Sequence, residues 1–514
     1  MILSYKHKFS NNFNLSAIAG AASFFNEDKG LSASTDGLSI PGQYYLSNSI
    51  NPITGSNYLD QRQINSLYAN LDLELYHFIY LSGTARRDQT STLPLANNAF
   101  IYPSVGVSAV LSDALKLPEI ISYLKVRSTW AQVNSGAIST TNPYASINTY
   151  ATANKYNNVS SLTYPSSYDT PNLIPNTVQS WESGLALGLL KNRLNIDATY
   201  FRNLESNNFQ NITPSQTSGY SSLLVNANEF VNKGLEFVIN GTPIKTDNFQ
   251  WTSGFNFSNN HTWIKSVTND TYGLGYYSQY LKVGDRIDKL YVDAGQFSSN
   301  GKVIVGANGY PLNSLYSTPI GYTDPNWIYG WQNTFQYKNL TLSISVDGRI
   351  GGLQYSTVNE KMLWGGTALS TVNQYRVDAN AGKSTFVVPG VVVTSGSATY
   401  DSHGNLLTDT RKYAPNTTAV DYIAFMESTG GNPYQNNDFY YSNTYLKLRT
   451  VSLTYTFSKK MLSKQKAFKA ASVSLIGNNL LLFSKLKNAD PDLGSDSFET
   501  PSTRSIGFNI NLKF

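Results

Sequence analysis

The last ten residues of the chain, 505–514, read SIGFNINLKF. Every second side chain in this stretch is large and apolar, and the residues between them are small, polar or charged. Because neighbouring side chains of a β-strand point to opposite faces, the pattern predicts a strand with one apolar and one polar face. A strand that crosses a bilayer at a tilt needs about 9–11 residues, so this stretch is also long enough to span a membrane.

The same two-residue period recurs throughout the chain. Leu340, Leu342, Ile344 and Val346, for example, alternate with polar residues, whereas a helix would repeat its apolar positions every 3.6 residues. Such segments predict an all-β protein of about fifteen strands, at 2–10, 12–24, 64–75, 77–88, 100–112, 121–134, 178–190, 193–205, 229–242, 248–260, 327–338, 340–350, 443–457, 467–478 and 505–514.

Short and long connections alternate between these strands. The short connections lie at 11–12, 76–77, 191–192, 242–247 and 338–339. The long ones span 25–63, 135–177, 206–228, 261–326, 351–442 and 479–504. Outer-membrane barrels have short periplasmic turns and long extracellular loops, so the alternation predicts an antiparallel transmembrane barrel with Phe514 at the periplasmic rim. Soluble sandwiches, propellers and β-helical adhesins share the two-residue period, but they give no reason to place every long loop at one end.

One predicted strand changes phase. Leu446 and Leu448 fall on one face of the 443–457 segment, whereas Val451 and Leu453 fall on the other. An extra residue in one strand produces this shift, so the sequence predicts a β-bulge near Arg449.

Composition excludes several other classes of protein. The 514 residues contain 41% hydrophobic and 14% charged residues, which is typical of a chain that folds. No run of about 18 apolar residues offers a membrane-spanning helix, and a net charge of +5 without a basic stripe gives no reason to expect nucleic acid. There is no Cys, the four His are scattered, and the nucleophile-elbow, zinc-protease and Walker A motifs are absent. We therefore expect no enzyme activity, no cofactor and no metal site.

Several short motifs occur in a fixed order along nearly the whole chain. They are Arg86-Arg87-Asp88 followed by Tyr102-Pro103-Ser104, then Leu124-Lys125-Val126-Arg127, Trp181-Glu182-Ser183-Gly184-Leu185, Asn192-Arg193-Leu194, Thr217-Ser218-Gly219-Tyr220, Asn232-Lys233-Gly234-Leu235-Glu236, Thr242-Pro243-Ile244-Lys245, Tyr445-Leu446-Lys447-Leu448-Arg449 and Gly477-Asn478-Asn479-Leu480. This ordered set resembles the SusC/RagA-type TonB-dependent outer-membrane transporters of Bacteroidota.

The resemblance implies a fold and a set of partners. The family barrel has twenty-two strands and a plug that fills its lumen. Residues 1–514 would then form its C-terminal part as one domain, with no plug and no signal peptide, and Met1 would be an artificial start or mark a split gene. The resemblance also implies a location in outer-membrane lipid, a SusD-like surface lipoprotein as partner, and coupling to the TonB complex through the missing N-terminal part. The implied activity is import of an oligosaccharide or oligopeptide.

Two other functions stay open at this point. A chain without a plug could be a non-transporting structural or adhesive barrel, or a nonfunctional fragment of a split gene. An outer-membrane enzyme is a third class, which the missing catalytic motifs disfavour. The DNA immediately upstream would discriminate, because an in-frame plug and signal peptide favour transport.

A few residues are candidates for functional roles. The large aromatics of the long loops suit stacking on sugars or peptide side chains, although they could instead pack against one another; they are Tyr272, Tyr276, Tyr277, Tyr280 and Trp364. The terminal Phe514 resembles the signal by which outer-membrane barrels are recognised for insertion. Asp490 to Asp496 has acidic residues spaced around a Gly, which predicts a polar turn, with a cation-binding loop as the alternative.

Overall fold

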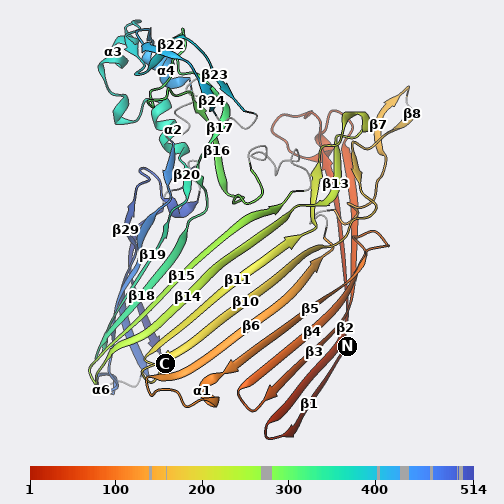
Figure 1. The fold of residues 1–514 in the computed structure, drawn as a ribbon, viewed down its shortest axis with the longest axis vertical. Coiled ribbons are helices and arrows are strands. Elements are labelled where there is room, and N and C mark those ends of the chain that lie inside the picture. Colours follow the sequence, from red (N-terminus) through yellow and green to blue (C-terminus); the bar gives the residue numbers. More distant parts are fainter. Residues whose placement is uncertain are drawn as a thin grey trace.

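The computed structural model contains one dominant antiparallel sheet of fifteen strands that follow one another in chain order. It describes residues 1–137, 142–157, 159–267, 281–401, 406–428, 439–463, 467–494, 496, 500 and 502–514. The strands lie tilted side by side and form a curved wall (Figure 1). They are β1 (Ile2–Ser10), β2 (Phe13–Ser34), β3 (Thr54–Leu75), β4 (Ile79–Thr90), β5 (Ala99–Val110), β6 (Ile121–Ser135), β10 (Asn176–Leu189), β11 (Leu194–Ser206), β14 (Glu229–Lys245), β15 (Phe249–Ser266), β18 (Trp327–Tyr337), β19 (Leu340–Ile350), β28 (Tyr445–Thr456), β29 (Ala470–Ser484) and β30 (Ser505–Lys513). The predicted fifteen-strand barrel wall is confirmed.

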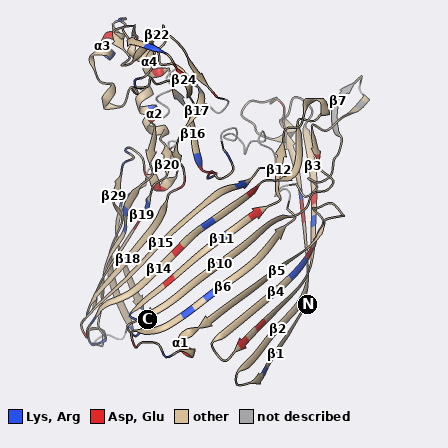
Figure 2. Cartoon of the chain, in the orientation of Figure 1, with Lys and Arg blue, Asp and Glu red and all other residues tan. Residues whose placement is uncertain are grey.

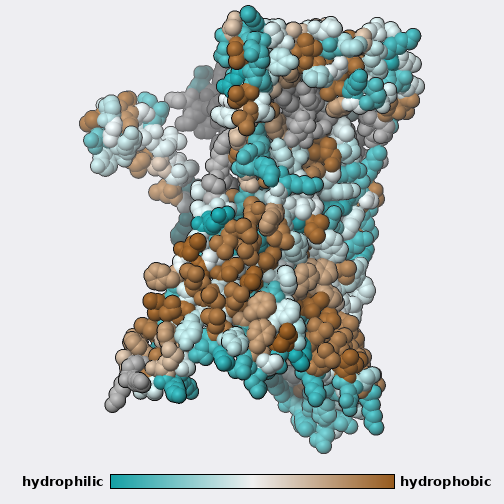
Figure 3. Space-filling view, turned by 90° about the vertical axis from the view of Figure 1, so that its left-hand side faces the viewer, coloured by the Kyte–Doolittle hydropathy of each residue, from teal (hydrophilic) through white to brown (hydrophobic). Residues whose placement is uncertain are grey.

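The register of the sheet collects the apolar positions on one face. Ile344 pairs with Val451, whereas the adjacent Ser343 pairs with Ser452 on the opposite face. The terminal strand follows the same rule, because Phe508 pairs with Leu475 and Asn509 with Ser474. Figure 3 shows an apolar band across the wall with polar residues above and below it. One face therefore suits lipid and the other suits a polar lumen.

All the tight turns lie at one end of the wall. Residues 11–12, 190–193 and 338–339 each join two strands there, with Lys191 and Asn192 at φ 59° in the left-handed region. Figure 1 places the C-terminus at this end and the long connections at the other. The predicted strand directions are confirmed, and Phe514 lies at the tight-turn end as expected; that this end is periplasmic stays a prediction.

Strands β2 and β3 are longer than predicted. Their pairing continues without a break from Phe13 opposite Leu75 to Ser34 opposite Thr54, so the expected 25–63 loop shrinks to residues 35–53. Strand β29 likewise extends to Ser484, into the expected 479–504 loop. These predictions of loop length were wrong because the strands were located by their alternating apolar and polar residues. A strand needs that alternation only where one face meets lipid, and beyond the bilayer both faces meet water.

The predicted bulge is confirmed. The β19–β28 register shifts between Ser345 and Val346, which pair with Thr450 and Leu448, and Arg449 is left as the extra residue. The β28–β29 register shifts at the same place.

The wall stays open within the described part of the chain. The strand order begins at β1 and ends at β30, and no ladder joins these two strands. Each edge strand therefore presents unpaired backbone groups along its outer side.

Smaller elements cluster at the end of the wall that carries the long connections. One group, which we name the surface lobe, is built from residues 281–326 and 351–428 around a core of Val305, Val388, Val420 and Phe425. It projects beyond the end of the wall (Figure 1). Its elements, together with the strand that follows it, are β16 (Lys289–Gly295), β17 (Asn313–Tyr322), β20 (Leu353–Tyr355), α2 (Thr357–Trp364), η3 (Leu369–Thr371), α3 (Gln374–Asn380), β21 (Phe386–Val387), β22 (Val391–Ser395), β23 (Ala398–Tyr400), β24 (Leu406–Asp409), β25 (Lys412–Pro415), β26 (Ala419–Val420), α4 (Tyr422–Glu427) and β27 (Tyr440–Ser442).

A second group stands at the same end of the wall, on the other side from the surface lobe (Figure 1), and comes from the β6–β10 and β11–β14 connections. Its elements are β7 (Ala151–Tyr156), β8 (Val159–Thr163), β9 (Ser167–Asp169), β12 (Asn208–Ile212), η2 (Gln216–Ser218) and β13 (Ser222–Ala227). The remaining short helices are η1 (Leu46–Asn48), α1 (Leu111–Ala114), α6 (Lys459–Leu462) and η4 (Pro491–Leu493). Among the described residues, no helix combines the length and apolar character needed to cross a membrane.

Candidate functional site

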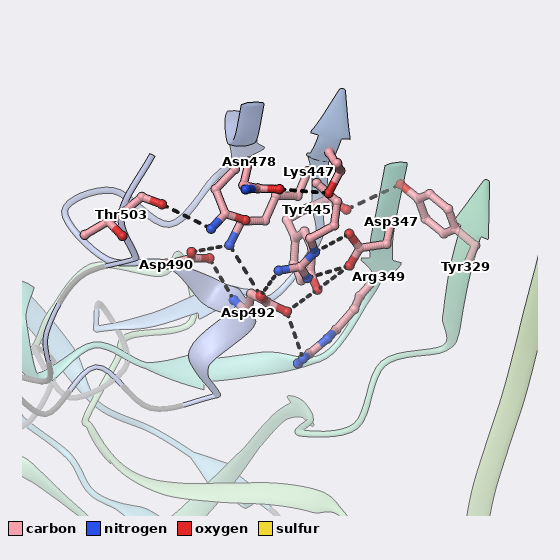
Figure 4. Close-up of polar contacts among 12 residues, drawn as sticks. Tyr329, Asp347, Arg349, Tyr445, Lys447, Asn478, Asp490, Asp492 and Thr503 are labelled. Carbon is pink, nitrogen blue, oxygen red and sulfur yellow. Dashed lines mark hydrogen bonds and ion pairs between the residues drawn. The ribbon is translucent and has the colours of Figure 1, made fainter. Parts of the chain in front are cut away.

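Charged side chains meet on the polar face of β19 and β28, where the β29–β30 connection folds back onto the wall (Figure 4). Asp347 pairs with Lys447 in the strand register, and Arg349 pairs with Tyr445. These positions alternate with Leu446 and the other apolar residues of the opposite face. The strand period therefore brings the charges to one side without any help from the loops.

Arg449 is the centre of this cluster. Its Nε and Nη2 donate to the two oxygens of Asp347 at 2.6 and 2.7 Å, and its Nη1 donates to Asp492 Oδ2 at 2.6 Å. The fork of a guanidinium matches a carboxylate in this bidentate way. Strand alternation places Arg449 on the same face as Lys447, two residues earlier, and the bulge then shifts the phase so that Val451 returns to the apolar face.

Lys447 is almost completely buried beneath the returning connection. Only 2% of its side chain is exposed, and its Nζ lies 2.6 Å from Asp490 Oδ2 and 3.3 Å from Asp492 Oδ2. The hydroxyl of Tyr445 donates to the other oxygen of Asp492 at 2.8 Å. Asp492 therefore accepts from three side chains of one strand.

A short turn presents the two carboxylates. Asp490 caps η4 by accepting from the backbone N–H of Asp492 at 3.0 Å, Pro491 is buried in the turn, and Gly494 ends it with φ 73°. A third carboxylate, Asp496, accepts from the Ser356 hydroxyl and from the backbone N–H of Thr357 at the start of α2. The residues predicted as a polar turn thus have carboxylates bound by the chain's own donors, which occupy oxygens that a cation would need.

The charges of the cluster reinforce one another. The Arg449 guanidinium, against the opposing effect of burial, holds the pKa of the Asp492 carboxyl well below its usual range. Burial alone would raise the pKa of Asp490, but hydrogen bonds led by that from Lys447 outweigh it and lower the pKa. Both carboxylates are therefore charged in the folded protein at neutral pH.

The same connection also reaches the surface lobe. The Asn359 side chain on α2 donates to the backbone oxygen of Lys487 at 2.9 Å and accepts from Asn488 at 2.8 Å. With the Asp496 contacts, these bonds join the polar face of the wall to α2 through residues 485–496, which we name the bridging loop. Chemically, the cluster offers paired charges that position a loop, not a nucleophile beside a base.

A groove also lies on the polar face of the first strands. It has a volume of about 710 Å3 and is lined by charged residues of both signs, namely Lys6, Lys8, Asp72, Glu74, Lys125 and Arg127. Arg127 donates to Asp197 at 2.7 and 3.0 Å, passing over Gly184 on the intervening strand, where a Cβ would lie 2.6 Å from its guanidinium. Figure 2 shows acidic and basic residues interspersed along the strands, without a stripe of one sign.

Of the residues predicted from the sequence to have functional roles in the loops, the structure describes Trp364. Tyr272, Tyr276, Tyr277 and Tyr280 lie outside the described residues. Trp364 lies on α2 with 44% of its surface exposed, and its Nε1 donates to the backbone oxygen of Glu427 at 3.0 Å. It therefore packs within the surface lobe, and its contact with a substrate stays a prediction.

The terminal aromatic occupies the tight-turn end of the wall. Phe514 packs its ring 5.0 Å from that of Phe468 and remains 73% exposed. Its role in assembly stays a prediction.

The sequence pattern does not predict that Asp347, Lys447 and Arg449 form a cluster. Two signals pointed toward it: the phase change at Arg449, and the acidic residues at 490–496, which needed basic partners. The meeting of Lys447 and Arg449 with Asp490 and Asp492 depends on the path of the bridging loop, which has no periodic pattern from which it could be predicted.

Comparison with known proteins gives relatives that span nearly the whole chain. TonB-dependent receptor P3 of Formosa agariphila is 24% identical over 506 residues, which cover 89% of this chain and 46% of the relative. TonB-dependent receptor SusC of Bacteroides thetaiotaomicron is 24% identical over 487 residues, which cover 88% of this chain and 44% of SusC. The chain thus spans about half the length of the curated relatives it matches. No protein-family model matches it.

A solved structure gives the same fold. The structure of the RagAB peptide transporter matches 100% of this chain and 55% of its own chain, with a TM-score of 0.74 and 17% identity. These findings confirm the predicted likeness to SusC/RagA-type TonB-dependent transporters, the barrel fold and the outer-membrane location. The relatives are named as receptors and transporters, not enzymes.

Proposed function

We propose that this chain supplies barrel wall and extracellular loops to a transporter that imports an oligosaccharide or oligopeptide across the outer membrane, driven by TonB. The observation that carries the proposal is the likeness to TonB-dependent receptors over about nine-tenths of the chain, on a wall with one apolar and one polar face. A barrel closed from such a wall would enclose a polar passage, which a polar solute needs to cross lipid.

The position of the chain within the whole transporter is part of the proposal. Residues 1–514 would form the C-terminal fifteen strands of a twenty-two-stranded barrel. The groove lined by Lys6, Lys8 and Glu74 would face the plug that fills the lumen of such barrels. Coupling to TonB would run through the N-terminal part of the complete transporter.

The proposal includes a SusD-like surface lipoprotein as partner. The surface lobe supports this role because it has its own apolar core and projects beyond the wall (Figure 1). Large exposed residues remain on it, with Leu369 at 87% and Val372 at 69% exposure, as expected of a surface that another protein can cover.

Growth on defined nutrients tests the function. Deleting the gene in its own organism should abolish growth on one oligosaccharide or peptide as sole nutrient, and the intact gene should restore it. A second strain without TonB should show the same loss. Normal growth of the deletion strain on every glycan and peptide tested would refute import and favour a structural or adhesive barrel, or a nonfunctional fragment.

A further inference from the structure

Four tyrosines gather among the extracellular loops, away from the charged cluster. Tyr150 precedes β7, Tyr164 follows β8, Tyr168 lies on β9, and Tyr220 stands between η2 and β13. The ring centroids of Tyr164 lie 5.7 Å from Tyr150 and 5.4 Å from Tyr220, and Tyr168 lies 5.2 Å from Tyr220. Two separate connections between wall strands therefore contribute to one aromatic surface.

Hydrogen bonds hold the segments that carry these rings. The hydroxyls of Tyr164 and Tyr220 lie 2.6 Å apart, so one donates to the other. The Asn148 side chain donates to the backbone oxygen of Asp169 and accepts from its N–H, at 2.9 and 2.7 Å. The backbone oxygen of Ser166 accepts from the N–H of Ser221 at 2.8 Å. A surface fixed in this way loses little conformational entropy when a ligand binds.

The aromatic surface is open to solvent. Tyr150 is 61% exposed and Tyr164 is 59% exposed, whereas Tyr168 and Tyr220 are half-buried behind them. The second group of loop elements packs Leu173 and Leu224 against Leu93 of the β4–β5 connection, in a small core that does not include these rings. Exposed aromatic side chains that are held in place are typical of binding surfaces.

Few charged residues lie near the rings in the sequence. The segments 142–154, 159–168 and 207–228 contain no Asp, Glu, Lys, Arg or His, but many Asn, Ser and Thr, and only Lys155 and Asp169 interrupt the first two of them. Sugar rings combine apolar C–H faces, which pack on aromatic rings, with hydroxyls, which bond amides and hydroxyl groups. A peptide carries terminal charges and often charged side chains, for which these segments offer no counter-charge.

We propose that Tyr150, Tyr164, Tyr168 and Tyr220 form a stacking surface for the uncharged sugar rings of a glycan on the extracellular side of the barrel. This inference rests on the proposed import function and narrows its substrate class. The exposed Tyr150 and Tyr164 would carry the direct contacts, and the Tyr164–Tyr220 hydrogen bond would fix the ring of Tyr164.

Binding to whole cells tests the proposal. The gene with its natural upstream sequence is expressed in the deletion strain, and the cells are titrated with fluorescently labelled neutral hexasaccharides of the α-1,4-, β-1,4- and β-1,3-glucan series. We expect one series to bind. The double variant Tyr150→Ala/Tyr164→Ala should bind it about tenfold more weakly, from about 0.5–1.5 kcal/mol for each aromatic contact. Tyr164→Phe should stay within about threefold of wild type, because it keeps the ring.

Controls separate this result from misfolding. Tyr44→Ala removes a tyrosine that is even more exposed, at 84%, from the β2–β3 connection and should leave binding unchanged. Equal amounts of each variant at the cell surface exclude an assembly defect.

Three results would overturn the proposal: no binding of any hexasaccharide, unchanged binding by the double alanine variant, or preferred binding of a labelled hexapeptide of mixed composition. Growth of the deletion strain tests import separately, so normal growth of that strain on every nutrient tested, together with sugar binding by cells that carry the intact gene, identifies failure of the import proposal alone.

Discussion

Replacing Lys447 by Met should release the bridging loop from the wall. Lys447 is 2% exposed and holds Asp490, itself 5% exposed, at 2.6 Å, so the substitution leaves a buried carboxylate without its cation. Removing one partner of a buried ion pair costs about 3–5 kcal/mol. The loop can escape part of this cost by moving away from the wall and hydrating Asp490, so the expected effect is local opening and not loss of the barrel.

Hydrogen exchange in the complete transporter in detergent micelles measures this opening. The N–H of Asp492 bonds Asp490 Oδ1 at 3.0 Å and that of Leu493 bonds the Asp490 backbone oxygen at 3.2 Å. If opening the loop in the wild type costs at least 3–5 kcal/mol, losing that stabilisation makes exchange of these N–H groups about two to four orders of magnitude faster. Lys485→Met is the matched control, since Lys485 is exposed on the same loop.

A second variant isolates the cause. In Lys447→Met/Asp490→Asn the buried charge is gone while the side-chain oxygen that caps η4 remains, so most of the protection should return. Wild-type exchange in the single variant, or no recovery in the double variant, would refute the idea that this ion pair fixes the loop.

Three further predictions concern the wall and its loops. Ile510→Arg on the lipid face of β30 should cost about 2–4 kcal/mol of stability and reduce the heat-resistant, folded band in gels of the complete transporter. Asn509→Arg on the polar face should have a much milder effect. Equal effects of the two variants would contradict the assigned faces. Gly348→Ala should destabilise the protein by about 1–3 kcal/mol and lower its unfolding temperature, because its Cβ would lie 2.2 Å from a backbone oxygen. Gly83→Ala, whose Cβ meets nothing within 4 Å, should change the unfolding temperature little. The pKa of Asp492 is lower in the folded than in the unfolded protein, so its contribution to stability is complete above about pH 4 and declines as the pH falls through the lower folded-state value. Protease cleavage within 485–494 should therefore rise in strong acid. Equal cleavage at pH 2 and pH 7, by a protease active at both, would count against this.

Most of the wall could be predicted from the sequence because lipid imposes a period. Ile506, Phe508 and Ile510 must face one way, and each tight turn marks where a strand reverses, so strand number and direction follow. The bulge at Arg449 was predictable for the same reason, since it disturbs that period.

The parts outside the lipid region were less predictable. The upper halves of β2 and β3 pair through backbone groups without an apolar face, and the surface lobe joins residues as distant as Val305 and Val420 in one small core. The ion pairs of Lys447 and Arg449 with Asp492 depend on where a loop of irregular sequence returns. Such long-range choices leave no local pattern in a single sequence.

The open edges of the wall carry an arithmetic consequence. Every strand runs opposite to its neighbour, so among fifteen strands the first and last, β1 and β30, point in the same direction. If these two strands paired directly, they would form a parallel ladder, which an up-and-down antiparallel cylinder does not contain. Any closed, all-antiparallel barrel that includes this wall must insert an odd number of strands between its two edges, and the seven that would complete twenty-two strands meet that condition.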